Sequence, residues 1–165
     1  TIDYKREATE FVAAMQASSA PAIAMLPQPY VTTAQMQMEN LTVALDLTEE
    51  WDKVSPDSAL VTGVLVVRKD FAEANPDAVE LMIQEYNSSV EYVNANVEDA
   101  AKLVVEYGIV PKEPVAVKAI PECNIVCITG EDMKAKVSGY LNVLFEQDAS
   151  SVGGAVPADD FYYGA

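Results

Sequence analysis

The stretch AIAMLPQPYVTT, residues 22–33, decides which fold the sequence predicts, because an apolar run ends there at two prolines and a helix follows. Before it, the alternating residues 1–4 predict a strand, and residues 7–18 carry apolar side chains at helical spacing. The order strand, helix, strand indicates a βαβ unit with a parallel sheet. Pro29 suits the first turn of a helix that we expect to reach about Met38.

Downstream of this unit, the pattern continues as an alternation of apolar runs and amphipathic segments. Three further strands are expected at residues 41–47, 60–67 and 124–129. Three further helices are expected: one starting at Pro76, one opening at Asn96 and closed by Gly108, and one over residues 131–147. Residues 48–51 are expected to lead into a polar loop around Ser55, Pro56 and Asp57. We also expect a connection punctuated by prolines before residue 124 and an irregular tail from Ser150. The sequence therefore predicts the α/β class.

Composition excludes several functions. The 165 residues carry 10 Lys and Arg against 26 Asp and Glu, a formal net charge of −16. Such a charge repels phosphate backbones and anionic membrane surfaces, so we expect no nucleic-acid partner. The chain contains no histidine, which excludes the Ser-His-Asp triad. We therefore assign no catalytic residue, expect no cofactor, and interpret the chain as not an enzyme.

The two cysteines are expected to be free, buried thiols. If Cys123 and Cys127 lie on one strand, their α-carbons are about 13 Å apart, beyond disulfide reach. Two cysteines without histidine are too few ligands for a structural zinc site, so no metal is expected. No apolar run is long enough to cross a bilayer as a helix. Because Thr1 is not Met, we expect an export signal to lie outside this chain.

One cluster of polar side chains has the position of a ligand site. Gln28, Tyr30, Thr32 and Thr33 lie between a predicted strand and the start of a predicted helix. In open α/β sheets, ligands collect at this edge, where helix N-terminal amides favour anions. The alternative is a proline-shaped turn with an ordinary capping network. Asn124 is a second candidate, which either hydrogen-bonds a ligand or caps a turn.

Large aromatic residues are weaker candidates for contact with a ligand. Trp51 and the pair Tyr162 and Tyr163 have rings suited to stacking on a ligand. Large aromatic side chains more often anchor packing, and that alternative stays open for all three.

Five segments together resemble a known protein family. They are AIAMLPQPYVT (22–32), VLVVRKDF (64–71) followed by Asn75 and Pro76, EYVNAN (91–96) with AAKL (100–103), IPECNI (120–125), and the tail with its Gly153-Gly154 pair. In order and spacing they are similar to the solute-binding proteins of ABC importers for nitrate, sulfonate, bicarbonate and thiamine precursors. The resemblance is to the C-terminal half, in a lipoprotein-like branch.

The resemblance implies a fold of the periplasmic-binding-protein type 2 kind, with two three-layer lobes around central, mainly parallel sheets. Residues 1–58 would end the second lobe, residues 59–69 would form a return hinge strand, and residues 70–165 would complete the first lobe. Ligand binding is then expected at Gln28, Tyr30, Thr32 and Asn124.

The resemblance also implies a function and its partners. We expect an extracytoplasmic component that captures a small organic or oxyanionic solute between the lobes and delivers it to a membrane ABC permease. The alternatives are an enzyme similar to thiamine-pyrimidine synthases and a sensor domain without transport. Because strands and helices of the first lobe would be missing, the isolated chain is expected to associate with itself or with the missing N-terminal half.

Overall fold

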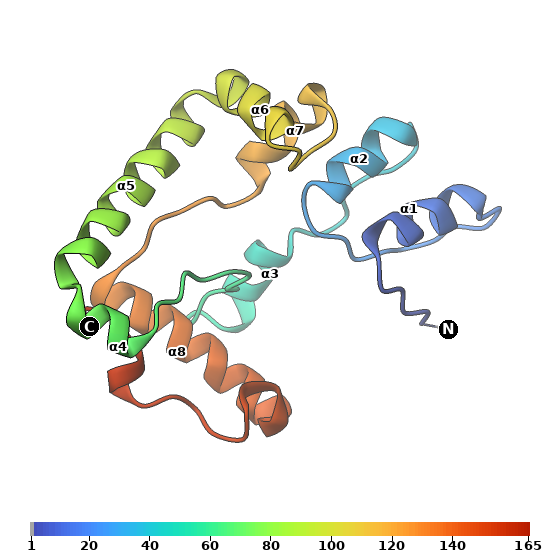
Figure 1. Cartoon of the computed structure of the whole chain (residues 1–165). Helices are drawn as coiled ribbons and strands as arrows, with labels where there is room; N and C mark the ends of the chain where they lie inside the picture. The colour runs from blue at the N-terminus through green and yellow to red at the C-terminus, as the bar shows by residue number, and fades with distance from the viewer. Residues whose placement is uncertain (1) are drawn as a thin grey trace. The chain divides into compact units, whose positions relative to one another are not determined.

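The computed structural model describes residues 2–165, and Thr1 lies outside the described residues. Its helices follow one another along the chain (Figure 1). They are α1 (Ala8–Ala17), α2 (Tyr30–Gln37), α3 (Leu47–Val54), α4 (Lys69–Ala74), α5 (Pro76–Ala95), α6 (Val97–Glu106), α7 (Glu113–Ala119) and α8 (Gly130–Gln147), with the 3₁₀ turns η1 (Ile120–Glu122), η2 (Ala149–Val152) and η3 (Asp159–Phe161).

The predicted α/β fold with central parallel sheets is wrong, because residues 2–165 contain no strand. The segments predicted as strands at 22–26, 41–47, 60–67 and 124–129 run mainly as irregular chain, and so does the described part of 1–4. A strand is stable only where a neighbour completes its hydrogen-bond ladder. Within the described chain, none of these segments pairs with another in a ladder.

The predicted positions of five helices are confirmed, although the side chain of Asn96 makes no cap bond at the start of α6. Helices α1, α2, α5, α6 and α8 all lie within a few residues of their predicted bounds. Gly108 adopts φ +70° after α6, as the predicted C′ glycine. The amide of Gly108 donates to the carbonyl of Val105 at 3.0 Å, and the amide of Ile109 donates to that of Val104 at 2.9 Å. These two bonds form a Schellman motif, which ends the helix.

Three helices lie where the sequence analysis expected none. They are α3, α4 and α7. Pro114 lies in the first turn of α7, where a missing N–H has no cost, so this proline suits the start of the helix. The predicted connection punctuated by prolines therefore contains a helix that the sequence analysis did not expect.

The described chain divides into two compact units. One contains the residues up to Thr42 together with Ile83–Val126, and the other contains Val43–Met82 with Cys127–Ala165. The boundaries predicted for the lobes, at residues 58 and 69, stay a prediction.

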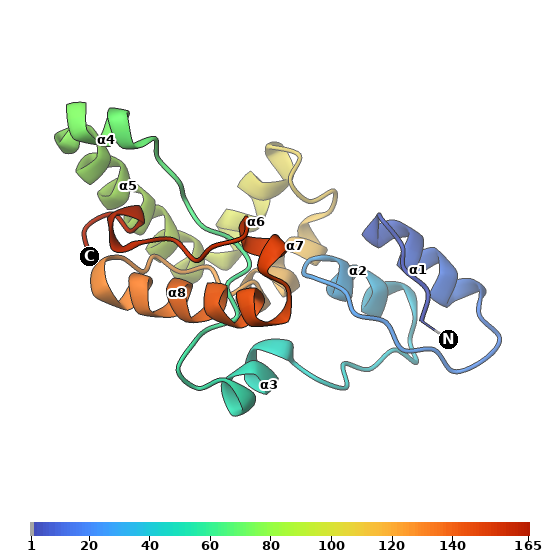
Figure 2. The same ribbon diagram turned by 90° about the horizontal axis from the view of Figure 1, so that it is seen from below.

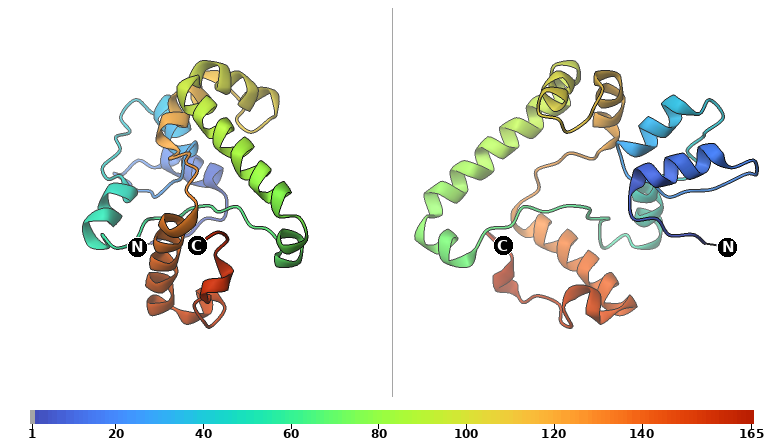
Figure 3. Two further views of the ribbon diagram at one scale, coloured as in Figure 1. Left: turned by 90° about the vertical axis from the view of Figure 1, so that its left-hand side faces the viewer. Right: turned by 45° about the vertical axis from the view of Figure 1, so that its right-hand side comes forward.

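The first unit has its core between α6 and α7, which lie side by side (Figure 3, right). Its buried members are small or β-branched: Ala100, Ala101, Val110, Val115, Ala116 and Ile120. Alanines at the contact let the two helix backbones approach closely, and each buried valine or isoleucine contributes about 1.5–3 kcal/mol by leaving water. Helix α2 packs on α7, and α1 packs on α2.

The second unit is arranged around α8. Figure 2 shows the chain beyond α8 running back beside that helix. Lys134 on α8 pairs with Asp159 at 3.2 Å, and Lys69 pairs with Asp160 at 2.7 Å. The hydroxyl of Tyr163 donates to Oε1 of Glu80 at 3.2 Å, and the neighbouring Tyr162 is buried. The tail predicted as irregular is thus fixed at its end by a buried ring and three polar contacts.

Gly139 marks the closest approach of α8 to the turn after α3. A β-carbon placed there would lie 2.9 Å from the carbonyl oxygen of Asp57 and 2.8 Å from the β-carbon of Ser58. Both atoms belong to a turn whose backbone is held by the amide of Ser58, which donates to the carbonyl of Ser55 at 3.1 Å. Glycine is therefore required here by space, although it weakens the helix locally.

We expect Gly139→Ala to lower the free energy of unfolding by about 1–3 kcal/mol, because overpacking against backbone outweighs the gain in helix propensity. Thermal unfolding followed by circular dichroism measures the change. Gly63→Ala is the matched control, since the space around Gly63 is open. A Gly139→Ala protein as stable as the control would contradict the close packing.

Candidate functional site

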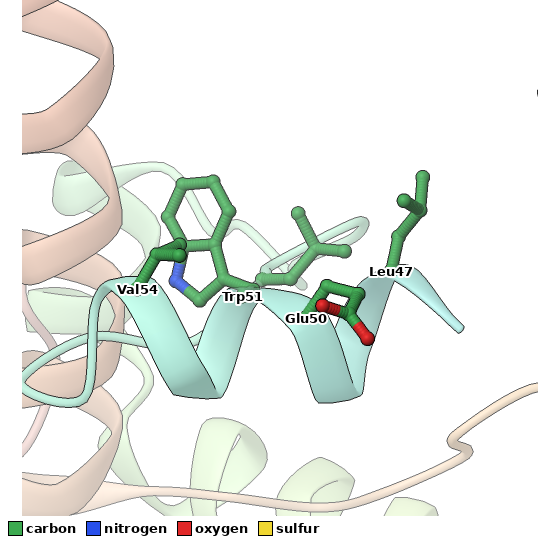
Figure 4. Close-up of a pocket in the computed structure, with 5 residues that line it drawn as sticks. Leu47, Glu50, Trp51 and Val54 are labelled. Atoms are coloured by element: carbon green, nitrogen blue, oxygen red, sulfur yellow. The ribbon is translucent and has the colours of Figure 1, made fainter. Parts of the chain in front are cut away.

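An apolar hollow of about 370 Å³ lies beside α3 in the second unit. It is lined by Leu47, Glu50, Trp51, Val54 and Leu60. Four of these residues are spaced i, i+3, i+4 and i+7, which places them on one side of the helix. Figure 4 shows the apolar side chains rising from the same side of α3, with the carboxylate of Glu50 beside them. A hollow of this lining suits the flat, apolar part of a small molecule.

Trp51 is held in a fixed position at the hollow. Its indole Nε1–H donates to Oγ of Ser58 at 2.8 Å, and that oxygen lies 2.9 Å from Oγ of Ser55. Its ring lies 5.3 Å from that of Tyr140 on α8, with an interplanar angle of 55°. A tilted pair at this distance is a favourable aromatic contact. The indole is therefore anchored on its polar edge and packed against α8, while it also lines the hollow.

The helix that carries the hollow begins at an aspartate cap. Oδ1 of Asp46 accepts from the amide of Thr48 at 2.8 Å and from that of Glu49 at 3.3 Å. These amides have no partner inside the helix, so the cap satisfies them. Glu49 and Glu50 in the first turn interact favourably with the helix dipole. An eight-residue helix depends on such local support, because it is too short to be stable alone.

Glu50 is the one titratable side chain that lines the hollow within the part of the chain that the structure describes. Its Oε1 accepts from Nζ of Lys53 at 2.7 Å. This hydrogen bond and the charge of Glu50 raise the pKa of Lys53 above its ordinary value. Both side chains are partly open to water, so the pair contributes little to stability. Glu50 thus places a hydrogen-bond acceptor at the edge of an apolar surface.

The hollow offers binding by apolar contact and one carboxylate that accepts hydrogen bonds or a proton. Residues 2–165 hold no cluster of three or more His, Cys, Asp or Glu arranged to bind a metal ion. Within the same range, no helix has the length and apolarity to span a bilayer.

The structure brings together two of the predicted ligand residues. Oε1 of Gln28 accepts from the hydroxyl of Thr32 at 2.9 Å and from its amide at 3.3 Å. Thr32 is buried, with 4% of its surface exposed, so its hydroxyl faces Gln28 and protein rather than solvent. These bonds satisfy the first turn of α2, as in the capping alternative.

Tyr30 and Asn124 are exposed, in the same unit as Gln28. Asn124 has φ +50°, a left-handed conformation that asparagine tolerates in turns. Its position in a turn fits the alternative that Asn124 caps a turn. A ligand role for Gln28, Tyr30, Thr32 and Asn124 stays a prediction.

Both cysteines are free, as predicted, but they are half-buried rather than buried. Burial raises the pKa of the Cys123 thiol, and the nearby charge of Glu122 raises it further. A thiol with a raised pKa is a poor nucleophile at neutral pH.

A comparison with protein families matched residues 31–142 to the family described as menaquinone biosynthesis. The match covers more than half of the 165 residues, and the chain belongs to this family. No curated protein and no solved structure matched the chain. The matched range includes every residue that lines the hollow, together with Tyr140, and it excludes Gln28 and Tyr30.

The family overturns the resemblance to ABC-importer solute-binding proteins. Solute capture, delivery to an ABC permease and the other transport terms are wrong for the same reason. The interpretation as a protein that is not an enzyme is also wrong, because a biosynthetic family indicates an enzymatic role. Neither the thiamine-pyrimidine-synthase alternative nor the sensor domain fits the family. Short apolar segments around prolines occur in many proteins. Their order alone was therefore an insufficient basis for assigning the chain to the solute-binding family.

The hollow was missed because Leu47 was predicted as the end of a strand and residues 48–51 only as the approach to a polar loop. The signal was present in the sequence DLTEEWDKV, residues 46–54. Asp46 followed three residues later by Glu49 is typical of a helix start. Leu47, Trp51 and Val54 then recur at helical spacing. Trp51 itself was considered as a stacking residue, with packing as the alternative, and the structure shows the packing contact.

We expect Gln28→Ala to lower the free energy of unfolding by about 1 kcal/mol, because two groups at the start of α2 lose their acceptor and Thr32 is buried. Chemical denaturation measures the change. Gln35→Ala, at an exposed position in the same helix, is the matched control and should have no such effect. Equal stabilities of the two variants would show that Gln28 does not support α2.

Proposed function

We propose that this chain is part of an enzyme of menaquinone biosynthesis and that the hollow beside α3 binds the ring of its substrate or product. The observation that carries the proposal is the position of the hollow. All of its lining residues, from Leu47 to Leu60, lie inside the range that matches the family.

The chemistry of the hollow supports a ring as the ligand. Menaquinone is a naphthoquinone, so its biosynthesis handles flat, unsaturated carbon rings. Trp51 offers an aromatic surface, and Leu47, Val54 and Leu60 provide the apolar contacts around it. Because its N–H is already bonded to Ser58, the indole loses little freedom when a ring binds. A preorganised aromatic contact of this kind gives affinity at low entropic cost.

Glu50 is the group placed to act on such a ring. Its carboxylate lines the hollow and accepts hydrogen bonds, so it either orients a hydroxyl of the substrate or takes a proton from it. Its Oε1 also accepts a hydrogen bond from Nζ of Lys53 at 2.7 Å.

In the source organism, deletion of the gene should lower the menaquinone content of the cells, measured by chromatography of extracted quinones. Restoration of the native gene should return the content to normal, and a Trp51→Leu gene should restore it only in part. An unchanged quinone content after deletion would overturn the proposed pathway role.

In vitro, a neutral naphthalene ring should bind to the hollow and change the fluorescence of Trp51, which is the single tryptophan of the chain. We expect Trp51→Leu to weaken binding by about 1–3 kcal/mol, measured by calorimetry with naphthamide as the probe. Tyr107→Leu is the control, because Tyr107 is 77% exposed and lies in the other unit.

Leu47→Ser provides a second variant that leaves the contact of Trp51 with Tyr140 intact. It should weaken binding without lowering the melting temperature, because Leu47 is already 45% exposed. Naphthamide binding that neither Trp51→Leu nor Leu47→Ser affects would place the ring site elsewhere.

A further inference from the structure

The C-terminal tail links helices of the second unit that do not pack on one another. Within the described part of the chain, neither α4 nor the start of α5 packs directly on α8. The tail runs back beside α8 (Figure 2), and two neighbouring aspartates join it to different helices. Asp159 pairs with Lys134 on α8, whereas Asp160 pairs with Lys69 at the start of α4. The tail is therefore the bridge from α8 to α4.

The polar contacts of this bridge are exposed to water. The side chains of Lys69 and Asp160 are 64% and 71% exposed, and that of Asp159 is 92% exposed. Pairs so open to solvent contribute little, because water screens their charges. Tyr162 is the one buried residue after α8 in the described chain. Burial of its ring is therefore the main attachment of the tail.

This attachment works against a cost of its own. The hydroxyl of Tyr162 is buried together with the ring and has no hydrogen-bond partner among the described residues. Burial also raises the pKa of this hydroxyl. A hydroxyl that leaves water without gaining a partner opposes the burial of its ring. The attached tail is thus less stable than the apolar part of the ring alone would make it.

A flexible joint precedes the attached residues. Gly153 has φ +78° and Gly154 has φ +90°, and a β-carbon at either position would lie in open space. Glycine adopts and leaves such left-handed conformations at low cost. Residues 155–157, which follow the pair, make no hydrogen bond in the described chain. Nothing between the glycine pair and Ala158 therefore resists rotation of the tail.

We propose that residues 155–165 form a strap that opens about Gly153 and Gly154 and thereby releases α4 and the start of α5 from α8. In the closed state, Tyr162 is buried and the strap joins the three helices. In the open state, the hydroxyl of Tyr162 regains water while α8 stays folded. The strap is a conformational device that goes beyond the proposed function and does not depend on it.

Hydrogen exchange followed by NMR on the full chain tests the opening. The amide of Phe161 donates to the carbonyl of Ala158 at 3.0 Å, and the amide of Tyr162 donates to that of Asp159 at 3.2 Å. Both amides should exchange faster than those in the middle of α8, because opening is local. The amide of Ala72, which donates to the carbonyl of Arg68 at 3.0 Å, reports on α4.

Tyr162→Phe should slow exchange at residues 161 and 162 by about fivefold, because the closed state no longer buries an unpaired hydroxyl. Exchange at Ala72 should slow with them, since the strap holds α4. Tyr163→Phe is the matched control: it removes the same atom from the next residue, where the hydroxyl donates to Glu80. This control should leave exchange unchanged or speed it.

The ion pairs give a second set of variants with the opposite effect. Lys69→Gln and Lys134→Gln should each speed exchange in the strap by about twofold, the factor expected for one exposed pair. Lys136→Gln is their control, because Lys136 lies on the same helix as Lys134 and pairs with Asp132 rather than with the tail.

Three outcomes would overturn the strap. Exchange in Tyr162→Phe as fast as in the native chain would show that the hydroxyl is already satisfied, for example by a bound water. Exchange of the tail at the same rate as the middle of α8 would show that the tail separates only when the whole unit unfolds. A response of the tail amides without any response at Ala72 would show that the tail frays without releasing α4. Ring binding and the pathway role would stand in each case.

Discussion

The approach of α8 to the turn after α3 is the constraint on which the second unit depends. At Gly139 the helix lies so close to Asp57 and Ser58 that no larger side chain fits without displacing backbone. That distance allows Trp51, which is bonded to Ser58, to pack against the ring of Tyr140 on the next position of α8. One glycine therefore makes possible the contact that joins α3 to α8.

This contact also explains why α3 carries a hollow. A helix of eight residues has too few internal hydrogen bonds to be stable alone, so it depends on the cap at Asp46 and on packing by Trp51. With the indole held by Ser58 and Tyr140, the neighbouring Leu47 and Val54 are left 45% and 79% exposed. Exposure of these apolar side chains to water is unfavourable, and their burial under an apolar ligand lowers the free energy of the complex.

The sequence predicted the helices that have clear ends, and it failed for the segments that need a neighbour. Helix α6 begins with the amide of Ala100 donating to the carbonyl of Asn96 and ends at Gly108, so local bonds set its ends, although the side chain of Asn96 makes no cap bond. Residues 60–67 are rich in valine and leucine, and they have the composition of a strand, yet Val66 is 81% exposed. A segment with strand propensity forms a strand only when a second strand completes its hydrogen-bond ladder. The sequence of the segment does not identify that second strand.

The candidate site shows the same division between local and distant information. The bond from Gln28 to Thr32 spans four residues, so the alternative of a capping network was available from the sequence. Trp51 and Tyr140 are 89 positions apart, and nothing in the local pattern of either residue indicates the other. The helical spacing of Leu47, Trp51 and Val54 is local and predicts an apolar side of α3. Whether that side becomes a core or a ligand site depends on how much of it other elements cover, and Leu47 and Val54 stay exposed beside the indole that packs on Tyr140 of α8.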